Sequence, residues 1–379
     1  MKVALVGPTY PHRGGIAHYT SLLAFHLNQC HTSRAYGFRE QYPGWLFPGR
    51  SQLDPSPSPL VEVEARRWLI PWWPPTWWQV WRDWLAWRPD VVVIQWWVPF
   101  MAPMTAWLAS RARHLGIRVI MVCHNVLPHE RSRLDTSLVR MALSRADRLI
   151  VHSIVDRTQA EALLPGCAVE VAPFPSYADV RSAGWSREHA RARVGVDGQV
   201  LLFFGFVRPY KGLMDLLDAL PAVLAELDVT LLVVGEIWGE VESYHDRVKG
   251  LGLGSRVRFF DRYVSNDEMA MFFAAADLVV LPYREATGSA VLQLAFGFGV
   301  PVVATKTGSM AEAVDDGQTG FLVEAGDVES LSRAIVRFFH EGRAAEFRHN
   351  IRQNQKRFAW EAVIDMALRP VAARLKTAG

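Results

Sequence analysis

Short apolar stretches recur along the chain, and stretches of helical pattern separate them. They are Lys2–Val6, Val91–Ile94, Ile117–Val122 and Arg148–His152 in the first half, and Val200–Phe206, Thr230–Val234, Arg256–Phe260, Leu278–Leu281 and Val300–Ala304 in the second. Continuous apolar runs of this length are typical of strands buried on both faces, and their alternation with helices predicts parallel sheets. The two series therefore predict an α/β protein with two Rossmann-like, doubly wound domains.

The break between the two series lies near residues 172–198, where a proline-containing stretch precedes a charged helical pattern. The chain of 379 residues is also too long for one ordinary core. We expect domains at residues 1–175 and 176–357, with an irregular excursion at residues 40–60. In such folds ligands bind beyond the carboxyl ends of the strands, so the site is expected in a central cleft between the domains.

Composition narrows the classes of function. The formal net charge is only +3, and no long basic run with interleaved aromatic residues occurs, which argues against nucleic-acid binding. Cys30, Cys123 and Cys167 lie far apart, so no metal-binding spacing and no disulfide framework emerges, and we expect a cytoplasmic protein. Residues 91–110 carry no charge, but Gln95 and two prolines interrupt them, which favours a buried strand over a membrane span.

Two loops after predicted strands suit an anionic ligand. Gly14 and Gly15 precede the first predicted helix, but their spacing is not Gly-x-Gly-x-x-Gly, which argues against NAD and favours a phosphate or a hydroxyl-rich ligand. Arg208 and Lys211 lie between a strand and a helix, where two cations at a helix N-terminus suit a phosphate or diphosphate. A plain turn at the start of a helix and a chance pair of surface cations are the simpler alternatives.

His124 follows the buried strand at Ile117–Val122, so it is expected at the carboxyl end of the sheet, where ligands bind. A structural histidine is the simpler alternative. His129 and Glu130 lie further along the same loop and are expected to be more exposed. No Asp-x-Asp triplet occurs in the chain, so we expect no metal ion at a diphosphate and positive charge from the two cations and helix dipoles instead.

Residues 283–294 read YREATGSAVLQL and place one acid, Glu285, before a turn of small residues. That turn contains Thr287, Gly288 and Ser289, and an apolar helical pattern follows it. Small residues allow a ligand to approach the backbone closely, and a helix N-terminus favours anions.

Together these segments resemble the family 4 retaining glycosyltransferases, which have the GT-B fold. GPTYPHRGGIAHYT resembles that family's N-terminal glycine loop, CHNVLPHE its histidine segment and GFVRPYKG its phosphate loop. ATGSAVLQLAFGFGVPVVAT and GSMAEAVDDGQTGFLV resemble its donor-binding region. Each motif is weak alone, but the five in the family's order are specific and span almost the whole chain. The C-terminal stretch resembles the family's last helix, so residues 358–379 are expected to pack back on the N-terminal domain.

The resemblance implies transfer of a sugar from a nucleotide-diphosphate-sugar donor, with retained anomeric configuration and without a metal or other cofactor. Arg208 and Lys211 would stabilise the departing diphosphate, and His124 would contact the donor sugar. The implied donor-binding residues are Gly14, Gly15, Gly205, Gly235, Tyr263, Thr287, Gly288, Ser289 and Gln293. A saccharide, a lipid-linked molecule or a small molecule is expected as the acceptor, and the nucleobase and sugar stay open, with UDP and GDP as candidate carriers.

The chain departs from the family in its acids. The family usually carries two glutamates separated by seven residues, and an ungapped count from the following Gly-Val-Pro motif puts Ala286 and Leu294 there. A shift of one residue gives Glu285 and Gln293 instead, with Glu285 as an imperfect catalytic acid. Phe206 also stands where the family commonly has an arginine.

Ten of the fifteen tryptophans fall within Trp68–Trp97. Within this segment, large apolar residues recur at the spacing of a helix, at Trp77, Trp81, Trp84 and Leu85. It predicts an amphipathic helix whose tryptophan side faces the core. The alternative is that part of this surface is exposed and binds a membrane or an apolar acceptor, with Arg66 and Arg67 facing lipid headgroups.

Two rival functions share the fold. One is a sugar-nucleotide epimerase or hydrolase. The other is a non-catalytic sugar-nucleotide-binding protein, which the missing acid pair favours. An oxidoreductase is disfavoured by the first glycine loop.

Overall fold

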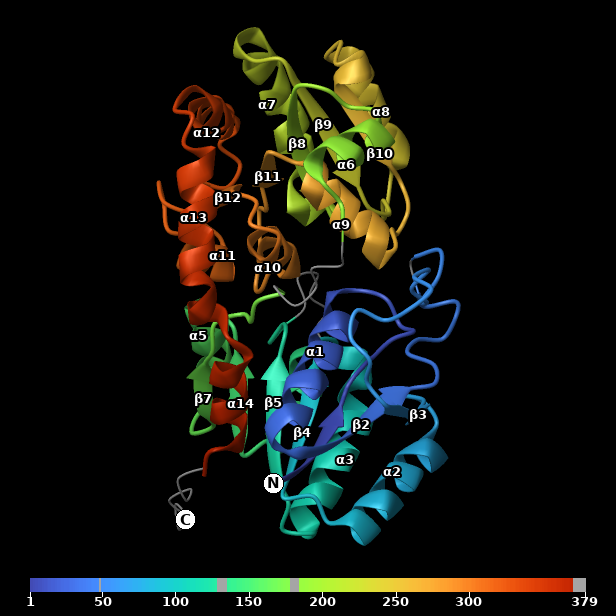
Figure 1. Cartoon of the computed structure of the whole chain (residues 1–379). Coiled ribbons are helices and arrows are strands. Elements are labelled where there is room, and N and C mark those ends of the chain that lie inside the picture. The colour runs from blue at the N-terminus through green and yellow to red at the C-terminus, as the bar shows by residue number, and fades with distance from the viewer. Residues whose placement is uncertain (48, 128–134, 178–183, 371–379) are drawn as a thin grey trace.

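The chain folds into two parallel sheets, one in each half of the sequence, with helices packed against them (Figure 1). The computed structural model describes residues 1–47, 49–127, 135–177 and 184–370. The two sheets and their helices confirm the predicted α/β class with two Rossmann-like domains.

The elements of the N-terminal half are β1 (Lys2–Val6), α1 (Gly15–Cys30), β2 (Thr32–Phe38), β3 (Ala65–Leu69), α2 (Pro74–Trp87), β4 (Val91–Trp96), α3 (Ala102–His114), β5 (Arg118–Cys123), α4 (Asp135–Leu143), β6 (Arg148–Val151), α5 (Ile154–Leu163) and β7 (Ala168–Val171). Those of the C-terminal half are α6 (Arg187–Val194), β8 (Gln199–Phe204), α7 (Leu213–Glu226), β9 (Val229–Val234), α8 (Val241–Gly250), β10 (Val257–Phe260), α9 (Asn266–Ala275), β11 (Leu278–Leu281), α10 (Ala290–Gly297), β12 (Val302–Thr305), α11 (Gly308–Ala313), β13 (Gly320–Val323), α12 (Val328–His340), α13 (Ala344–Asn354) and α14 (Trp360–Leu368).

The strand order reverses beside the first strand of each sheet. The N-terminal sheet runs β3-β2-β1-β4-β5-β6-β7 and the C-terminal sheet β10-β9-β8-β11-β12-β13, with parallel pairing in both. The strands that follow β1 are added first on one side of it and then on the other, and the same holds for β8. The connections therefore diverge beside β1 and β8, which leaves a crevice at the carboxyl ends of the strands. The loops after β1 and β8 are the ones that carry the predicted glycines and cations.

All nine strands predicted from apolar runs are present, with ends shifted by a few residues. The pattern missed β2, β3, β7 and β13. Of these, β3 (ARRWL) and β7 (AVEV) form the two edges of the N-terminal sheet. An edge strand has one unpaired side and tolerates charged residues, so it lacks the continuous apolar run of a central strand.

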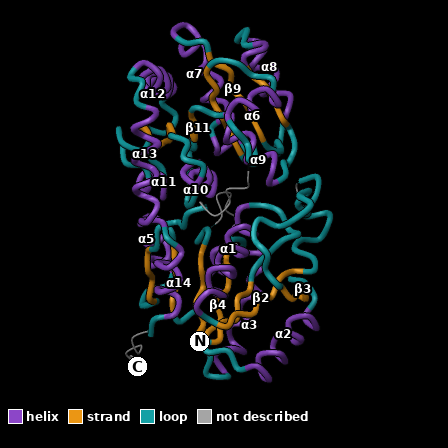
Figure 2. The backbone as a smooth tube through the Cα atoms, in the orientation of Figure 1, coloured by secondary structure: helices purple, strands orange, loops and turns teal. Residues whose placement is uncertain are grey.

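The last helices connect the two halves. Figure 2 shows α12, α13 and α14 along one side of the molecule, with α14 at the N-terminal half, where it packs against α1 and β6. The Trp360 ring stacks on His26 with ring centroids 5.5 Å apart, and its Nε1 donates a hydrogen bond to the Ser176 carbonyl (3.0 Å). Residues 371–379 of the expected returning segment lie outside the described residues, and the boundaries at 175 and 357 stay predictions.

Helix α2 buries one side only. Trp77, Val80 and Trp84 are buried against the sheet, which confirms the core-facing interpretation for Trp77 and Trp84, whereas Trp81 and Leu85 are only half-buried. Trp78 lies on the other side and is 49% exposed. Arg66, which the alternative interpretation placed toward lipid headgroups, forms an ion pair with Asp83 of α2 (2.5 Å). No helix among the described residues has both the length and the apolar character to cross a bilayer.

Candidate active site

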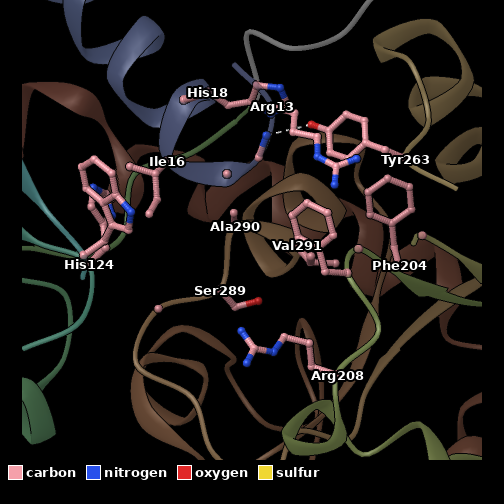
Figure 3. Close-up of a pocket in the computed structure, with 18 of the residues that line it drawn as sticks. Arg13, Ile16, His18, His124, Phe204, Arg208, Tyr263, Ser289, Ala290 and Val291 are labelled. Carbon is pink, nitrogen blue, oxygen red and sulfur yellow. Dashed lines mark hydrogen bonds between the residues drawn. The ribbon is translucent and has the colours of Figure 1, made fainter. Parts of the chain in front are cut away.

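A cavity of about 410 Å³ lies between the two halves of the chain, at the crevice that the strand order predicts. Both halves contribute loops to it, and Figure 3 shows side chains from each around the central space. The predicted residues that line it are Gly14, Gly15, His124, Gly205, Arg208, Lys211, Gly235, Tyr263, Thr287, Gly288 and Ser289. Residues far apart in sequence thus converge on one space, as the motifs indicated. His129 and Glu130 lie outside the described residues.

The glycine loop is held by the opposite half of the chain. Gly14 has a positive φ of 102°, and its N–H donates to the Tyr263 hydroxyl at 3.0 Å (Figure 3). A Cβ atom on Gly15 would come within 3.0 Å of the Ala290 Cβ atom, so the loop lies directly against the start of α10. Tyr177 donates a hydrogen bond to the Gly15 carbonyl at 3.0 Å. The loop therefore closes over the position where α10 begins.

Two cations lie at the other end of the cavity. Arg208 and Lys211 follow β8, and the Arg208 guanidinium extends toward Ser289 at the start of α10 (Figure 3). Lys211 is buried, and burial followed by the nearby Arg208 charge lowers its pKa to about 8. Because a buried ammonium is costly without a counter-charge, this end of the cavity is suited to an anion.

Glycines make room beside Lys211. A Cβ atom on Gly205 would lie 3.1 Å from the Lys211 Nζ atom, and one on Gly235 would lie 2.1 Å from the Gly205 carbonyl oxygen. Both residues also have positive φ angles, 93° and 142°. Glycine is therefore required at both positions for the loops after β8 and β9 to pass each other and leave room for the Lys211 ammonium.

His124 lines the cavity from the N-terminal side. It follows β5, and its Nε2 atom lies 2.7 Å from the Gln95 Oε1 atom. Burial, and then the neighbouring His152, lower the pKa of His124 well below its usual value, so the ring is neutral near pH 7. The Thr287 hydroxyl donates to the His124 carbonyl (3.0 Å), which joins the histidine loop to the small-residue turn across the cleft.

The expected acids are absent from the cavity. Ala286 and Leu294 line it, whereas Glu285 is exposed and Gln293 is buried beneath it, and neither Glu285 nor Gln293 is among the lining residues. The lining supports the ungapped count, and the roles of Glu285 as a catalytic acid and of Gln293 as a donor contact stay untested predictions. Neighbouring residues of a turn or helix point in different directions, so a shift of one residue removes a side chain from the site.

One acid that the sequence analysis missed does line the cavity. Glu236 directly follows Gly235 after β9, and it is the only carboxylate among the described lining residues. Arg13 of the glycine loop binds both of its oxygens (2.6 and 3.1 Å), and the Arg50 N–H donates to it at 2.8 Å. Burial raises the pKa of Glu236, but the hydrogen bonds from Arg13 and the Arg50 amide outweigh it, and the net pKa lies below the usual value.

Aromatic rings surround the Arg13 guanidinium. It lies over the rings of Phe47, Phe206 and Tyr263, at 5.2 to 5.3 Å from their centroids. Phe206 occupies the position where the resembled family commonly has an arginine, so a cation reaches this place from the N-terminal half instead. The signal available in the sequence was the arginine directly before Gly14.

Comparisons with known proteins agree with this arrangement. Residues 14–176 match the model of the glycosyl transferase 4-like domain, and residues 198–341 match that of glycosyl transferases group 1.

Among the described residues, no group of three or more His, Cys, Asp and Glu could hold a metal ion.

Relatives and solved structures extend the comparison. The D-inositol 3-phosphate glycosyltransferase 1 of Catenulispora acidiphila is 29% identical over 69% of each chain, and that of Streptomyces griseus is 33% identical over 53% of this chain and 46% of its own. The alignments to several other such enzymes also span only about half of their length. The structure of Anabaena HepE in complex with UDP-glucose is 20% identical, with a TM-score of 0.73 over 97% of this chain and 98% of its own. This last likeness shows that the fold is GT-B.

Proposed function

The chain belongs to the glycosyltransferases in which a family 4-like domain precedes a group 1 domain, and from that premise we propose that it transfers a hexose from a nucleotide-diphosphate donor to an acceptor with retention. The observation that carries the proposal is the convergence of a buried lysine, an arginine and the start of α10 on one side of the interdomain cavity. The UDP-glucose that HepE binds is the first donor to test.

The cations fit the departing diphosphate. Arg208 can bind two phosphate oxygens at once, and Lys211 provides a buried point charge beside them. As the bond between the anomeric carbon and the phosphate oxygen breaks, negative charge grows on that oxygen, and preorganised cations stabilise it more than they stabilise the intact donor. This assignment needs no metal ion for the leaving group, so metal independence is part of the proposal.

The retained configuration follows from attack on the same face as the leaving group. The acceptor oxygen bonds to the anomeric carbon as the phosphate oxygen leaves, and that oxygen accepts the acceptor's proton. No protein base is then compulsory, which suits a cavity in which Arg13 holds Glu236, the one carboxylate among the lining residues that the structure describes. Neutral His124 is suited to a hydrogen bond with the donor sugar.

A non-catalytic sugar-nucleotide-binding protein is the second candidate. The observation that favours it is the apolar pair Ala286 and Leu294 at the positions of the family's two glutamates. Binding of a sugar nucleotide with neither transfer nor hydrolysis would establish it. Hydrolysis at a rate that added alcohols do not change would instead indicate a hydrolase.

The first test is binding. A thermal-shift panel of uridine, guanosine and adenosine diphosphates and their hexose conjugates is expected to identify one nucleobase series. A ligand present at a hundred times its Kd stabilises the folded protein by about 2.7 kcal/mol. A panel in which no diphosphate raises the midpoint would contradict the proposal.

The second test is turnover of the donor found in this way. Arg208→Ala and Lys211→Ala are each expected to lower kcat by about a hundredfold or more, as loss of a charge-stabilising group often does. Lys249→Ala, an exposed lysine on α8, is the matched control and is expected to retain the wild-type rate. Near-normal rates in both cavity variants would refute the role, and a similar loss in Glu285→Gln would restore that acid to the mechanism.

A further inference from the structure

The outer side of α2 presents tryptophans that do not contribute to the core. Trp72 and Trp73, directly before the helix, are 37% and 57% exposed, and Trp78 on its outer side is 49% exposed. A single exposed apolar residue is ordinary on a protein surface, but large apolar side chains gathered in one place mark an interaction site. In Figure 1 this helix lies at the outside of the N-terminal half, away from the C-terminal half.

The exposed rings continue into a ladder of indoles that joins α2 to α3. The centroids of Trp78 and Trp81 are 6.3 Å apart, and those of Trp81 and Trp107 are 6.5 Å apart. The Arg82 guanidinium lies 4.9 Å from the centroid of Trp78, and that of Arg111 lies 5.3 Å from the centroid of Trp107. We call this surface, made of Trp72, Trp73, Trp78, Trp81, Arg82, Trp107 and Arg111, the Trp–Arg face.

The charge of the Trp–Arg face is positive and uncompensated. Asp83, the acid nearest to it on α2, already pairs with Arg34 (3.1 Å) and with a second arginine from β3. Within the described parts of the chain, no carboxylate forms an ion pair with Arg82 or Arg111. Arg111 also lines a groove beside α4, together with Trp107, His114 and Arg145, and this groove extends the positive charge.

Aromatic rings connect the Trp–Arg face to the cavity. Trp97 and Tyr42 both line the cavity, and the Trp97 Nε1 atom donates to the Tyr42 hydroxyl at 2.7 Å. Tyr42 stacks on Phe100 with centroids 6.2 Å apart, and Phe100 lies 6.2 Å from Trp72. A path of ring contacts therefore runs from the cavity lining to the exposed Trp72 before α2.

We infer that the Trp–Arg face docks on an anionic membrane surface, and that the acceptor is a lipid that reaches the cavity along this aromatic path. Tryptophan rings settle at the boundary between headgroups and acyl chains, and arginine binds lipid phosphates through paired N–H groups. The membrane is favoured over an acidic protein because exposed indoles lie beside guanidinium groups that form no ion pair among the described residues, a combination suited to the boundary between anionic headgroups and acyl chains. The part that concerns the acceptor rests on the proposed function.

Flotation with vesicles tests the docking. The full-length protein is expected to float with vesicles of phosphatidylcholine and phosphatidylglycerol at low salt, and much less with phosphatidylcholine alone or at high salt. Arg82→Gln/Arg111→Gln is expected to weaken binding to the anionic vesicles by about twenty-fivefold, at about fivefold for each arginine. Trp73→Ser/Trp78→Ser is expected to weaken it at least as much.

Two matched control variants test whether vesicle binding depends on this face rather than on charge and exposed rings anywhere on the protein. Arg193→Gln/Lys249→Gln removes two exposed cations from the C-terminal half, and Phe25→Ser removes an exposed ring from α1. Both are expected to float like the wild type. A wild type that never floats with anionic vesicles overturns the inference, as do face variants that float normally. Binding to an acidic protein without any vesicle binding would overturn it in favour of that partner.

Measurements of donor binding in the same variants distinguish failure of this inference from failure of the proposed function. In the face variants the thermal shift caused by the sugar nucleotide is expected to equal that of the wild type, because none of the changed residues lines the cavity. Loss of flotation with an unchanged thermal shift supports docking alone. Flotation without any response to nucleotides would support docking and contradict the donor. Equal turnover of soluble and vesicle-borne acceptors would overturn the acceptor part.

Discussion

Lys211 is the residue whose chemistry differs most from that of the same residue on a surface. Its pKa is lowered to about 8 by burial and then by Arg208, whereas an ordinary lysine keeps its proton up to about 10.4. The empty folded protein therefore binds fewer protons than the unfolded chain between about pH 8 and 10.4. The cost of burying this charge is present in full below pH 8, and this group's contribution to stability rises with pH through that window.

A bound diphosphate reverses this preference, because its negative charge favours the protonated amine. We expect donor binding above pH 8 to take up a proton and the affinity to fall by up to about tenfold per pH unit above that value. Calorimetry at pH 9 in buffers of different ionisation enthalpy measures the uptake. Lys211→Met is expected to bind weakly at every pH and without proton uptake. An equal uptake in that variant would assign the proton to another group.

At the scale of one element, helix α2 carries both buried and exposed tryptophans. Trp84 is fully buried and meets the Tyr36 ring at 6.0 Å, whereas Trp78 points outward. Deleting a buried indole costs about 3–5 kcal/mol, which in a domain of this size lowers the melting midpoint by roughly 6–20 °C. Removing an exposed one costs about 0.5 kcal/mol or less.

We therefore expect Trp84→Ala to lower the midpoint strongly and Trp78→Ala to leave it within about 2 °C of the wild type. Thermal unfolding followed by circular dichroism measures both. A large loss in Trp78→Ala would show that its ring packs into the structure, and it would remove the premise that this side of α2 is available for docking.

At the scale of the whole molecule, the two halves meet around the buried pair of Arg13 and Glu236, which are 223 residues apart in sequence. Removing one partner of such a pair leaves an uncompensated buried charge, so it costs more than removing both. A second cross-domain pair, Arg50 with Asp261, is more exposed, with 61% of the arginine side chain accessible. Exposed pairs contribute about 0–1 kcal/mol.

These differences predict a double-mutant cycle. Arg13→Gln and Glu236→Gln are each expected to weaken donor binding by tenfold or more, and the double variant by clearly less than the product of the two effects, because paired groups couple. Isothermal titration of the donor measures all four proteins. Arg50→Gln, whose amide bond to Glu236 is unchanged, is expected to alter Kd by about fivefold or less. Independent effects of the two buried residues would show that they do not act as a cross-domain pair.

Much of the site could be read from local pattern. The runs of apolar residues located nine of the strands, although not the interior strand β2, and the loops after these strands were expected to place Gly14, Arg208 and His124 at one cleft. Spacing left open differences of a single residue. Whether Glu285 or Ala286 faces the cavity depends on the direction of one side chain in a turn, which sequence spacing does not determine.

The sequence by itself determined the fold class, most of the strands and the loops that surround the cavity, because these depend on periodicity and on the residue types at strand ends. Only the tertiary structure decided that Glu236 is the carboxylate in the cavity, that Arg13 binds it, and which tryptophans of α2 stay exposed. These outcomes depend on contacts between segments that are distant along the chain. No local pattern encodes such a contact, since it forms only when the two halves pack together.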